Sequence, residues 1–594
     1  MRYNCRVRVR HVIGLAAIFL FAGSFFLSVR AEPPIQKGQK KFWVFFKDKG
    51  ALAKKANLTA VARAHLTPRS VRRRLLRGSG HPLFDATDLP VNEAYVQVLE
   101  KARFRVWNRS RWLNAVSVFA FPSDTSLLKA FPFVKKVRPV RVLIRPRLTT
   151  SPQKRAPELL EKGAEAHTFH YGESYDQEAL IHVPELHDMG YSGQGIIVGM
   201  LDTGFRWRTH KAFAHLKVLA EYDFIHHDSI TANQAKDSLF FPDKPGQDSH
   251  GTETLSTIAG FAPNHLIGPA YGATFILAKT EYVPTETRIE EDNWVAGIEW
   301  EDSLGADIVS SSLGYLDFDD GFTYNPKTDL NGKTAVTTIA AELAVKKGIV
   351  VVNSVGNEYH SRPTTLITPA DGDSVIAVGA VNLTGELAPF SSDGPTSDGR
   401  IKPDVCAPGV SVTVAAPYTP DGFTRSSGTS FSCPLTSGVA ALLLQAYPSL
   451  KPMQLREALR RTASKAQEPD NYWGWGIINA YEAYLYGKEV ATGFNGTRIP
   501  RNLELSDVYP NPARGLVSFR YGLPKNLPVV VRIYNVLGQR VDQINVGERL
   551  AGSNHLFTWE GVSAGGEKLL SGIYFCVVTA GSLRAVKRFV FLAK

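Results

Sequence analysis

GIIVGMLDTG, residues 195–204, is an apolar run that ends in a carboxylate followed by a Thr-Gly turn. A continuous apolar run of this length is typical of a strand buried on both faces in a parallel sheet. Three later runs have the same character, at residues 308–309, 348–352 and 375–378. A helix-compatible stretch at 293–300 precedes the first of them. This alternation predicts a doubly wound α/β domain over residues 163–487, with its site at the carboxyl ends of the strands.

Asp202 closes the first apolar run, and two further motifs follow it along the chain. One is His250-Gly251-Thr252, which opens a helix-compatible stretch, and the other is Gly428-Thr429-Ser430, which precedes a helical run. A carboxylate can fix the tautomer of a histidine, and that histidine can take the proton of an attacking serine hydroxyl. Each motif alone has a structural explanation, either a turn after a strand or a serine that caps a helix. Together, in the order Asp, His, Ser, they predict a catalytic triad.

Two more segments follow predicted strands and have groups suited to hydrolysis of a peptide bond. Asn357 offers a side-chain amide that can donate to the oxyanion of a tetrahedral intermediate, together with the backbone N–H of Ser430. The segment Ser312-Leu313-Gly314 offers exposed backbone that can pair with an extended peptide as an added strand. These residues predict a site that binds and cleaves a polypeptide.

With these motifs, residues 171–486 resemble the peptidase domain of the subtilisin-like serine proteases. Two further runs match that family, KPDVCAPG at 402–409 and GWGIINA at 474–480. The resemblance implies four roles, namely Asp202 as orienting acid, His250 as general base and then acid, Ser430 as acyl-forming nucleophile and Asn357 as oxyanion donor.

The sequence departs from the family pattern on either side of the predicted triad. Phe431 follows the nucleophile, and Glu253-Thr254 stands where the family usually has His-Val. Neither change removes a catalytic group. The resemblance also assigns Ser312 to Gly314 and residues 364–370 to the wall of the specificity pocket. Ile367 in that wall predicts a shallow pocket for small or medium apolar side chains.

The predicted chemistry requires no cofactor, and the metal content is unknown from the sequence. Calcium commonly accompanies the family, and a carboxylate-rich loop contains Asp317, Asp319 and Asp320. A twelve-residue calcium loop with a closing Glu is absent from the sequence, so a solvated loop is favoured and structural calcium stays an alternative. The cysteines after Cys5 are predicted to be buried thiols, with a Cys406–Cys433 disulfide as the alternative.

Residues 1–31 have the pattern of a signal peptide. Four arginines precede an apolar run from Val12 to Val29, and Val29-Arg30-Ala31 has small residues at the spacing that a signal peptidase reads. The run is about long enough to cross a bilayer, so an uncleaved anchor is the alternative. This pattern predicts export.

Residues 32–162 form a predicted α+β unit, with strand-like runs at 42–46 and 115–120 around helix-compatible stretches and a cluster of arginines. Residues 1–162 hold 33 Lys+Arg and 9 Asp+Glu, a net charge of +24, whereas residues 163–594 hold 35 and 47, a net charge of −12. The opposite charges predict that the basic part binds the acidic part. Loss of the basic part leaves an acidic protein, which argues against a nucleic-acid partner.

This basic unit resembles the inhibitory prodomain of subtilases, which packs on the enzyme and threads its end through the active site. Its end, from Arg145 to Gln153, is predicted to be a cleavable linker. An accessory domain that stays attached is the alternative.

Residues 505–594, after a linker at 488–504, alternate short strands with Gly and Pro turns, the pattern of a β-sandwich. Three of its runs, at 509–512, 534–538 and 570–575, resemble the C-terminal sorting domain of the type IX secretion system of Bacteroidetes-like bacteria. The resemblance implies transit through the periplasm and across the outer membrane, with the type IX machinery as a partner. A retained carbohydrate- or protein-binding module is the alternative.

The sequence thus predicts a secreted or cell-surface serine endopeptidase that acts on proteins or peptides and is made with its own prodomain. The alternative is a non-catalytic cell-surface protein that uses the cleft and the β-sandwich to bind partners. Retention of all four chemical groups argues against it.

Overall fold

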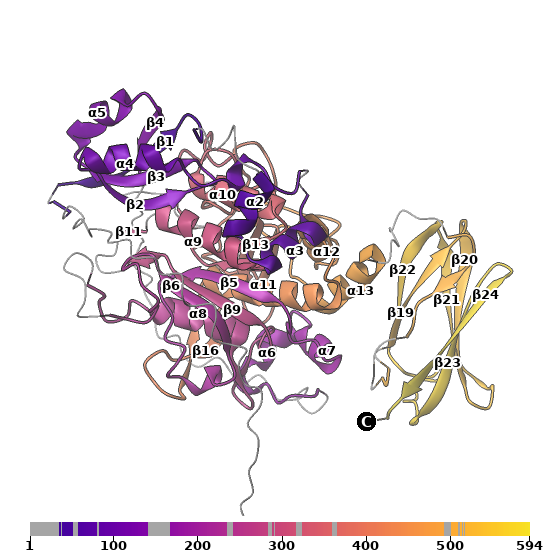
Figure 1. Ribbon diagram of the computed structural model, residues 1–594. Coiled ribbons are helices and arrows are strands. Elements are labelled where there is room, and N and C mark those ends of the chain that lie inside the picture. Colours follow the sequence, from indigo (N-terminus) through magenta and orange to yellow (C-terminus); the bar gives the residue numbers. More distant parts are fainter. Residues whose placement is uncertain are drawn as a thin grey trace, which may run out of the picture.

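The computed structural model describes residues 35–593, except 37, 51–57, 80–81, 141–166, 235–241, 283–287, 290, 316–323, 359–364, 492–499, 509–510, 514 and 516 (Figure 1). The predicted signal peptide, the predicted cleavable linker at 145–153 and the carboxylate-rich loop at 317–320 therefore lie outside the described residues. Within the described part, no helix combines the length and the apolar character needed to cross a membrane.

The central domain is built on a parallel sheet of seven strands among the described residues. Their spatial order is β15 (Val405–Pro408), β14 (Ile376–Val381), β13 (Val350–Ser354), β12 (Ile308–Ser311), β5 (Ile197–Asp202), β9 (Thr274–Lys279) and β6 (Lys217–Asp223). The chain adds strands on one side of β5 and then on the other, so β5 lies at the topological switch point. Open α/β sheets bind ligands at that point, beyond the carboxyl ends of the strands.

Helices cover both faces of this sheet. On one face lie α8 (Ser249–Ala259) and α11 (Thr429–Ala446), and on the other lie α9 (Glu291–Leu304) and α10 (Val336–Lys346). The alternation of side chains along β5 explains both contacts, because Val198 joins the core with α8 and α11 whereas Ile197 joins the core with α9 and α10. The predicted α/β fold is confirmed.

Shorter elements complete this domain. They are α6 (Tyr175–Ala179), α7 (Val183–Asp188), β7 (Phe261–Ala262), β8 (Leu266–Ile267), β10 (Glu281–Tyr282), β11 (Arg288–Ile289), β16 (Val412–Ala415), β17 (Phe423–Ser426), α12 (Pro452–Arg461) and α13 (Ala480–Ala491). The last helix runs four residues past 487, where the sequence predicted the domain to end, because its apolar residues continue to pack on the core.

The N-terminal unit is an antiparallel sheet in the order β2 (Arg105–Ser110), β3 (Ala115–Ala120), β1 (Lys40–Phe46) and β4 (Val134–Pro139). Helices α4 (Glu93–Lys101) and α5 (Thr125–Ala130) cover one face, where Val44 is buried. The other face packs on the core around α9, where Trp43 is buried. Two further helices, α2 (Leu58–His65) and α3 (Pro68–Arg77), precede α4, and α3 packs against α9.

The C-terminal unit is a β-sandwich next to α13 (Figure 1). One sheet has the order β18 (Glu504–Leu505), β19 (Val517–Leu523) and β22 (Gly552–Trp559). The other has the order β21 (Arg540–Arg549), β20 (Leu527–Asn535), β23 (Gly572–Ala580) and β24 (Leu583–Phe591). Phe519 and Val531, one from each sheet, share a single buried core. Arg520 of β19 forms an ion pair with Glu482 of α13, which links the sandwich to the central domain.

Candidate active site

Asp202 is the last residue of β5, at the switch point of the sheet, and α8 brings His250 to it. Close approach of the two elements depends on Gly251, because a Cβ there would lie 2.1 Å from the carbonyl oxygen of Gly204 and 3.1 Å from Cβ of Asp202. As a result, His250 Nδ1 lies 2.7 Å from Asp202 Oδ1. The carboxylate can therefore hold the proton on Nδ1 and leave Nε2 free to accept another.

The carboxylate of Asp202 is buried and held by two more donors. The backbone N–H of Thr203 donates to Oδ1 at 2.7 Å, and the hydroxyl of Thr254 donates to Oδ2 at 2.9 Å. In the sequence, Thr254 stands out only as a departure from the family pattern. Its position four residues after His250, on the same face of α8, is the signal that could have identified it.

Ser430 is the second residue of α11, two residues after Gly428 at the helix N-cap. Its carbonyl accepts a hydrogen bond from the hydroxyl of Ser312 at 2.8 Å, and its own hydroxyl lies 3.5 Å from the carbonyl oxygen of Ser312. Nε2 of His250 is buried and makes no hydrogen bond to any residue that the structure describes. The hydroxyl and the imidazole are thus not hydrogen-bonded to each other in this state, as is common in sites without substrate.

Asn357 places a side-chain amide donor at the start of α11, next to the backbone N–H of Ser430. Its Oδ1 accepts hydrogen bonds from the backbone N–H of Thr429 at 2.9 Å and from the Thr429 hydroxyl at 3.0 Å, which fixes the orientation of the amide. A Cβ built on Gly428 would lie 3.5 Å from Asn357 Nδ2 and 3.7 Å from the backbone nitrogen of Ser430. Both N–H donors therefore border one small space, which the glycine leaves open.

The two departures from the family pattern leave this arrangement in place. Phe431 is buried with Val412 and Val414 of β16, and its ring centre lies 6.3 Å from that of His250. Glu253 Oε2 accepts a hydrogen bond from the hydroxyl of Ser426 at 2.9 Å, and burial raises the pKa of Glu253. The large side chain of Phe431 is thus buried in a small hydrophobic cluster of its own.

The segments predicted to line a specificity pocket lie side by side. The backbone N–H and carbonyl of Tyr315 exchange hydrogen bonds with Thr368 at 2.9 and 3.0 Å. Ile367 fills the space next to Gly314, because a Cβ on Gly314 would lie 1.9 Å from Cδ1 of Ile367. Asn353 Nδ2 donates to the carbonyl of Leu313 at 2.9 Å, and this hydrogen bond holds segment 312–314 in position. Thr364 lies outside the described residues.

A cluster with the composition of a metal site lies at the ends of β6 and β9. Asp223, His226 and Asp243 have ligand atoms within 4.8 Å of one another. The ammonium of Lys279, fully buried, lies 2.8 Å from Asp223 and 2.7 Å from Asp243. A buried lysine between two carboxylates supplies the positive charge that a cation would bring, so we assign no metal to this cluster.

The sequence of this chain is similar to those of known proteins. Residues 193–476 match the subtilase family. The subtilisin of Bacillus pumilus is 34% identical over 309 residues, which are 51% of this chain and 96% of that protein. Subtilisin E of Bacillus subtilis (strain 168) is 34% identical over 310 residues, 51% of this chain and 69% of that protein. The chain belongs to the subtilase family.

As a subtilase the protein is a serine endopeptidase, which favours the predicted enzyme over a non-catalytic binding protein. The N-terminal unit of this subtilase also matches a known family, because residues 41–155 match the peptidase S8 propeptide domain of Bacteroidota. Residues 512–583 match the FlgD Ig-like domain, in agreement with the β-sandwich fold. Cys406, Cys433 and Cys576 are free and buried, so the alternative of a Cys406–Cys433 disulfide is wrong.

Proposed function

We propose that Ser430 is the nucleophile of this subtilase, with His250 as general base and Asp202 as the acid that orients it. The observation that carries the proposal is the 2.7 Å contact between His250 Nδ1 and Asp202 Oδ1, with Nε2 left available. Rotation of the Ser430 side chain turns its hydroxyl from the Ser312 carbonyl toward Nε2, which takes the proton as Oγ attacks the scissile carbonyl.

The tetrahedral intermediate then places its negative charge in the space beside Gly428. Asn357 Nδ2 and the backbone N–H of Ser430 donate to the oxyanion there, and the N-terminus of α11 adds a favourable dipole. Protonated His250 gives its proton to the leaving amine, which leaves an acyl group on Oγ. Water activated by the same imidazole hydrolyses that ester, so peptide-bond cleavage needs no cofactor.

Hydrolysis of a fluorogenic peptide by processed enzyme tests these roles, with an added protease removing the propeptide where a variant does not process itself. Asp202→Asn keeps the shape of the side chain but favours the wrong tautomer of His250, and we expect kcat to fall about 10⁴-fold. Ser430→Ala should lower kcat to a comparable degree or further. Unchanged rates in both variants would rule out the proposed triad, because the activity would then come from other groups.

We also propose that residues 32–162 are an inhibitory propeptide. The match to a propeptide domain supports this role, as do the packing of its sheet on α9 and the buried ion pair of Lys41 with Asp292 at 3.0 Å. Addition of the separately prepared propeptide to processed enzyme should then inhibit hydrolysis at a 1:1 ratio. Full activity with the propeptide bound would contradict an inhibitory role.

Export and sorting are a further proposal, with residues 1–31 as signal peptide and residues 505–594 as a type IX sorting domain. The β-sandwich and its Ig-like match are compatible with this role and with a binding module. Deletion of 505–594 should leave peptidase activity intact but retain the enzyme in the periplasm of a type IX-competent host. Normal delivery to the surface without the domain would favour the binding module.

The pocket beside Ile367 is proposed to accept small or medium apolar side chains. Cleavage of a peptide library would show this preference, and a preference for Phe, Tyr or Arg would contradict it. Structural calcium can be tested separately, because a chelator should leave the initial rate unchanged but lower the midpoint of thermal unfolding if calcium is bound.

A further inference from the structure

Helix α3 of the propeptide docks on the peptidase domain at the end of the sheet opposite to the active site. It contacts Asp307, which directly precedes β12 and accepts a hydrogen bond from the backbone N–H of Ile197, the first residue of β5, at 2.9 Å. Asp202 is the last residue of that strand, roughly 17 Å away at 3.3 Å per residue. Contacts of α3 are therefore separate from contacts in the catalytic cleft.

The backbone on both sides of α3 is tied to the ends of two peptidase helices. The N–H of Thr67 donates to the carbonyl of Ser303 in α9 at 2.9 Å, and the N–H of Ser79 donates to the carbonyl of Lys346 in α10 at 3.0 Å. Gly305 follows α9 and has no room for a side chain, because a Cβ there would lie 2.9 Å from the backbone nitrogen of Ser70. The docked helix thus fits closely between the two helix ends.

Arg73 is fully buried at the centre of this contact. Its guanidinium donates to the carbonyls of Ala306 at 2.7 Å and Lys347 at 3.2 Å, which follow α9 and α10, and it forms an ion pair with Asp302. The carboxyl ends of helices carry partial negative charge, which favours a cation at this position. One arginine thus donates hydrogen bonds to carbonyl groups at the ends of two peptidase helices.

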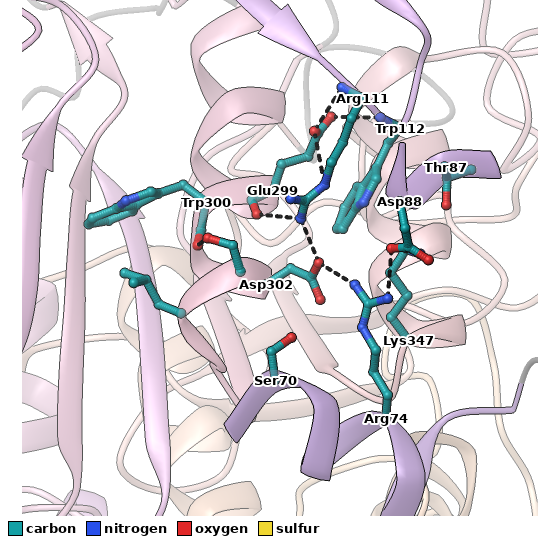
Figure 2. A network of polar contacts seen from close by, with 12 residues as sticks. Ser70, Arg74, Thr87, Asp88, Arg111, Trp112, Glu299, Trp300, Asp302 and Lys347 are labelled. Carbon is teal, nitrogen blue, oxygen red and sulfur yellow. Dashed lines mark hydrogen bonds and ion pairs between the residues drawn. The ribbon is translucent and has the colours of Figure 1, made fainter. Parts of the chain in front are cut away.

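Asp302 is the acidic centre of the contact, shown in Figure 2. Besides Arg73, it pairs with Arg74 at 2.6 Å and with Arg111 at 2.8 Å. Burial alone would raise the pKa of Asp302, but these guanidinium groups outweigh it and hold the pKa at about 2. Arg74 also contacts Asp88 of the propeptide at 2.7 Å, where Lys347 of the peptidase reaches the same carboxylate at 2.9 Å.

Asp307 is a second acidic centre, paired with Arg69 and Arg77. The peptidase supplies the two carboxylates, the carbonyl groups at the helix ends and Gly305. The propeptide supplies the arginines that pair with them. A buried carboxylate that loses its partner is strongly destabilising, and the planar fork of arginine fits carboxylates and carbonyls better than lysine does. The peptidase therefore has a surface whose chemistry selects arginines on one face of a helix.

We propose that this surface of the peptidase, around Asp302 and Asp307, is a docking site for an arginine-bearing helix that acts independently of the catalytic cleft. Its occupant is segment 67–79 of the propeptide, before and after the propeptide is cleaved. The inference rests on the proposed propeptide role of residues 32–162. It assigns α3 the task of holding the cleaved propeptide on the enzyme from the far end of the sheet.

The test uses the full chain with Ser430→Ala, which prevents digestion, and with Arg73, Arg74 and Arg77 each changed to Gln to weaken the chain's own α3. A fluorescent peptide of residues 67–79 is then added, and its anisotropy is measured. We expect saturable binding. Adding Asp302→Asn to the chain should weaken it at least about 30-fold, as expected when one partner of a buried charge pair is removed.

The matched control chain carries Ser430→Ala and Arg72→Gln, because Arg72 lies on the same helix but is exposed. Its own α3 keeps the site occupied, so the peptide should not bind. Equal binding to the two chains, equal binding with Asp302→Asn, or no binding to the first chain would overturn the proposal.

A second preparation covers the case in which the triple variant does not fold, which its thermal unfolding would reveal. It is wild-type enzyme that has processed itself and has been inactivated with a fluorophosphonate, and the labelled peptide should displace the bound propeptide from it. Failure of the proposed catalytic function would appear instead as an absent fluorophosphonate label. Peptide binding to the Ser430→Ala chain would then be unaffected, so the two failures are distinguishable.

Discussion

Asn357→Ala removes one of the two N–H donors that border the space beside Gly428. The donor is well oriented in the structure, because both hydrogen bonds from Thr429, at 2.9 and 3.0 Å, go to the amide oxygen and leave Nδ2 facing that space. The substrate carbonyl carries little charge before attack, whereas the intermediate carries a full one. The variant should therefore lose stabilisation mainly of the transition state.

The size of the effect follows from the type of interaction. Loss of one oxyanion donor costs about 2.7–4 kcal/mol, so kcat should fall about 10²–10³-fold while KM changes little. Thr429→Val is the matched variant, because it removes the 3.0 Å hydroxyl contact to Asn357 but keeps the backbone one. A neutral hydrogen bond contributes about 0.5–1.5 kcal/mol, which predicts a loss of about two- to tenfold.

The assay is steady-state hydrolysis of a fluorogenic peptide by processed enzyme, with active sites counted by fluorophosphonate labelling. We expect a large kcat effect for Asn357→Ala, a small one for Thr429→Val, and similar active-site counts. A rise in KM at unchanged kcat in Asn357→Ala would contradict the oxyanion role of Asn357, because the amide would then bind the ground state and the intermediate equally.

Other substitutions test the remaining parts of the site. Gly251→Ala should lower kcat about 10²-fold, because a Cβ 2.1 Å from the Gly204 carbonyl oxygen displaces α8, and misplacement of a catalytic group by about 1 Å has that effect. Ile367→Ala should open the space beside Gly314 and raise kcat/KM for large apolar side chains relative to alanine by about tenfold, measured with paired substrates. Lys279→Met removes the ammonium that lies between two buried carboxylates and should cost about 3–5 kcal/mol in urea unfolding, whereas unchanged stability would show that this ion pair does not stabilise the fold.

The central fold could be predicted because its strands are locally distinctive. The apolar run that ends in Asp202 became β5, and the runs at 348–352 and 375–378 became β13 and β14, since parallel strands are buried on both faces. Strand β6 was not predicted, because it is partly exposed and its sequence, KVLAEYD, lacks a continuous apolar run. The buried strand β9 was also not predicted, although it contains the apolar run FILA, so local pattern identified only some of the buried strands.

Contacts between distant segments were not predictable in the same way. From the arginine cluster of α3, only the net positive charge of the N-terminal unit could be predicted. No local pattern relates Arg73 to Asp302, which lies 229 residues later in the chain. The spacing of Thr254 from His250 places both on one face of α8, but the hydrogen bond from Thr254 to Asp202 depends on how α8 packs against β5. The sequence shows which charged and hydroxyl groups are present, but which of them pair depends on how whole elements pack.

The most direct test of the account is a time course of intact mass for the full chain beside its Ser430→Ala copy, with a fluorophosphonate probe added at each point. We expect that only the wild type loses its basic N-terminal segment and takes up one label, which maps to Ser430. Label at another residue, or equal processing of the Ser430→Ala chain in the absence of other proteases, would contradict the claim that Ser430 is the nucleophile.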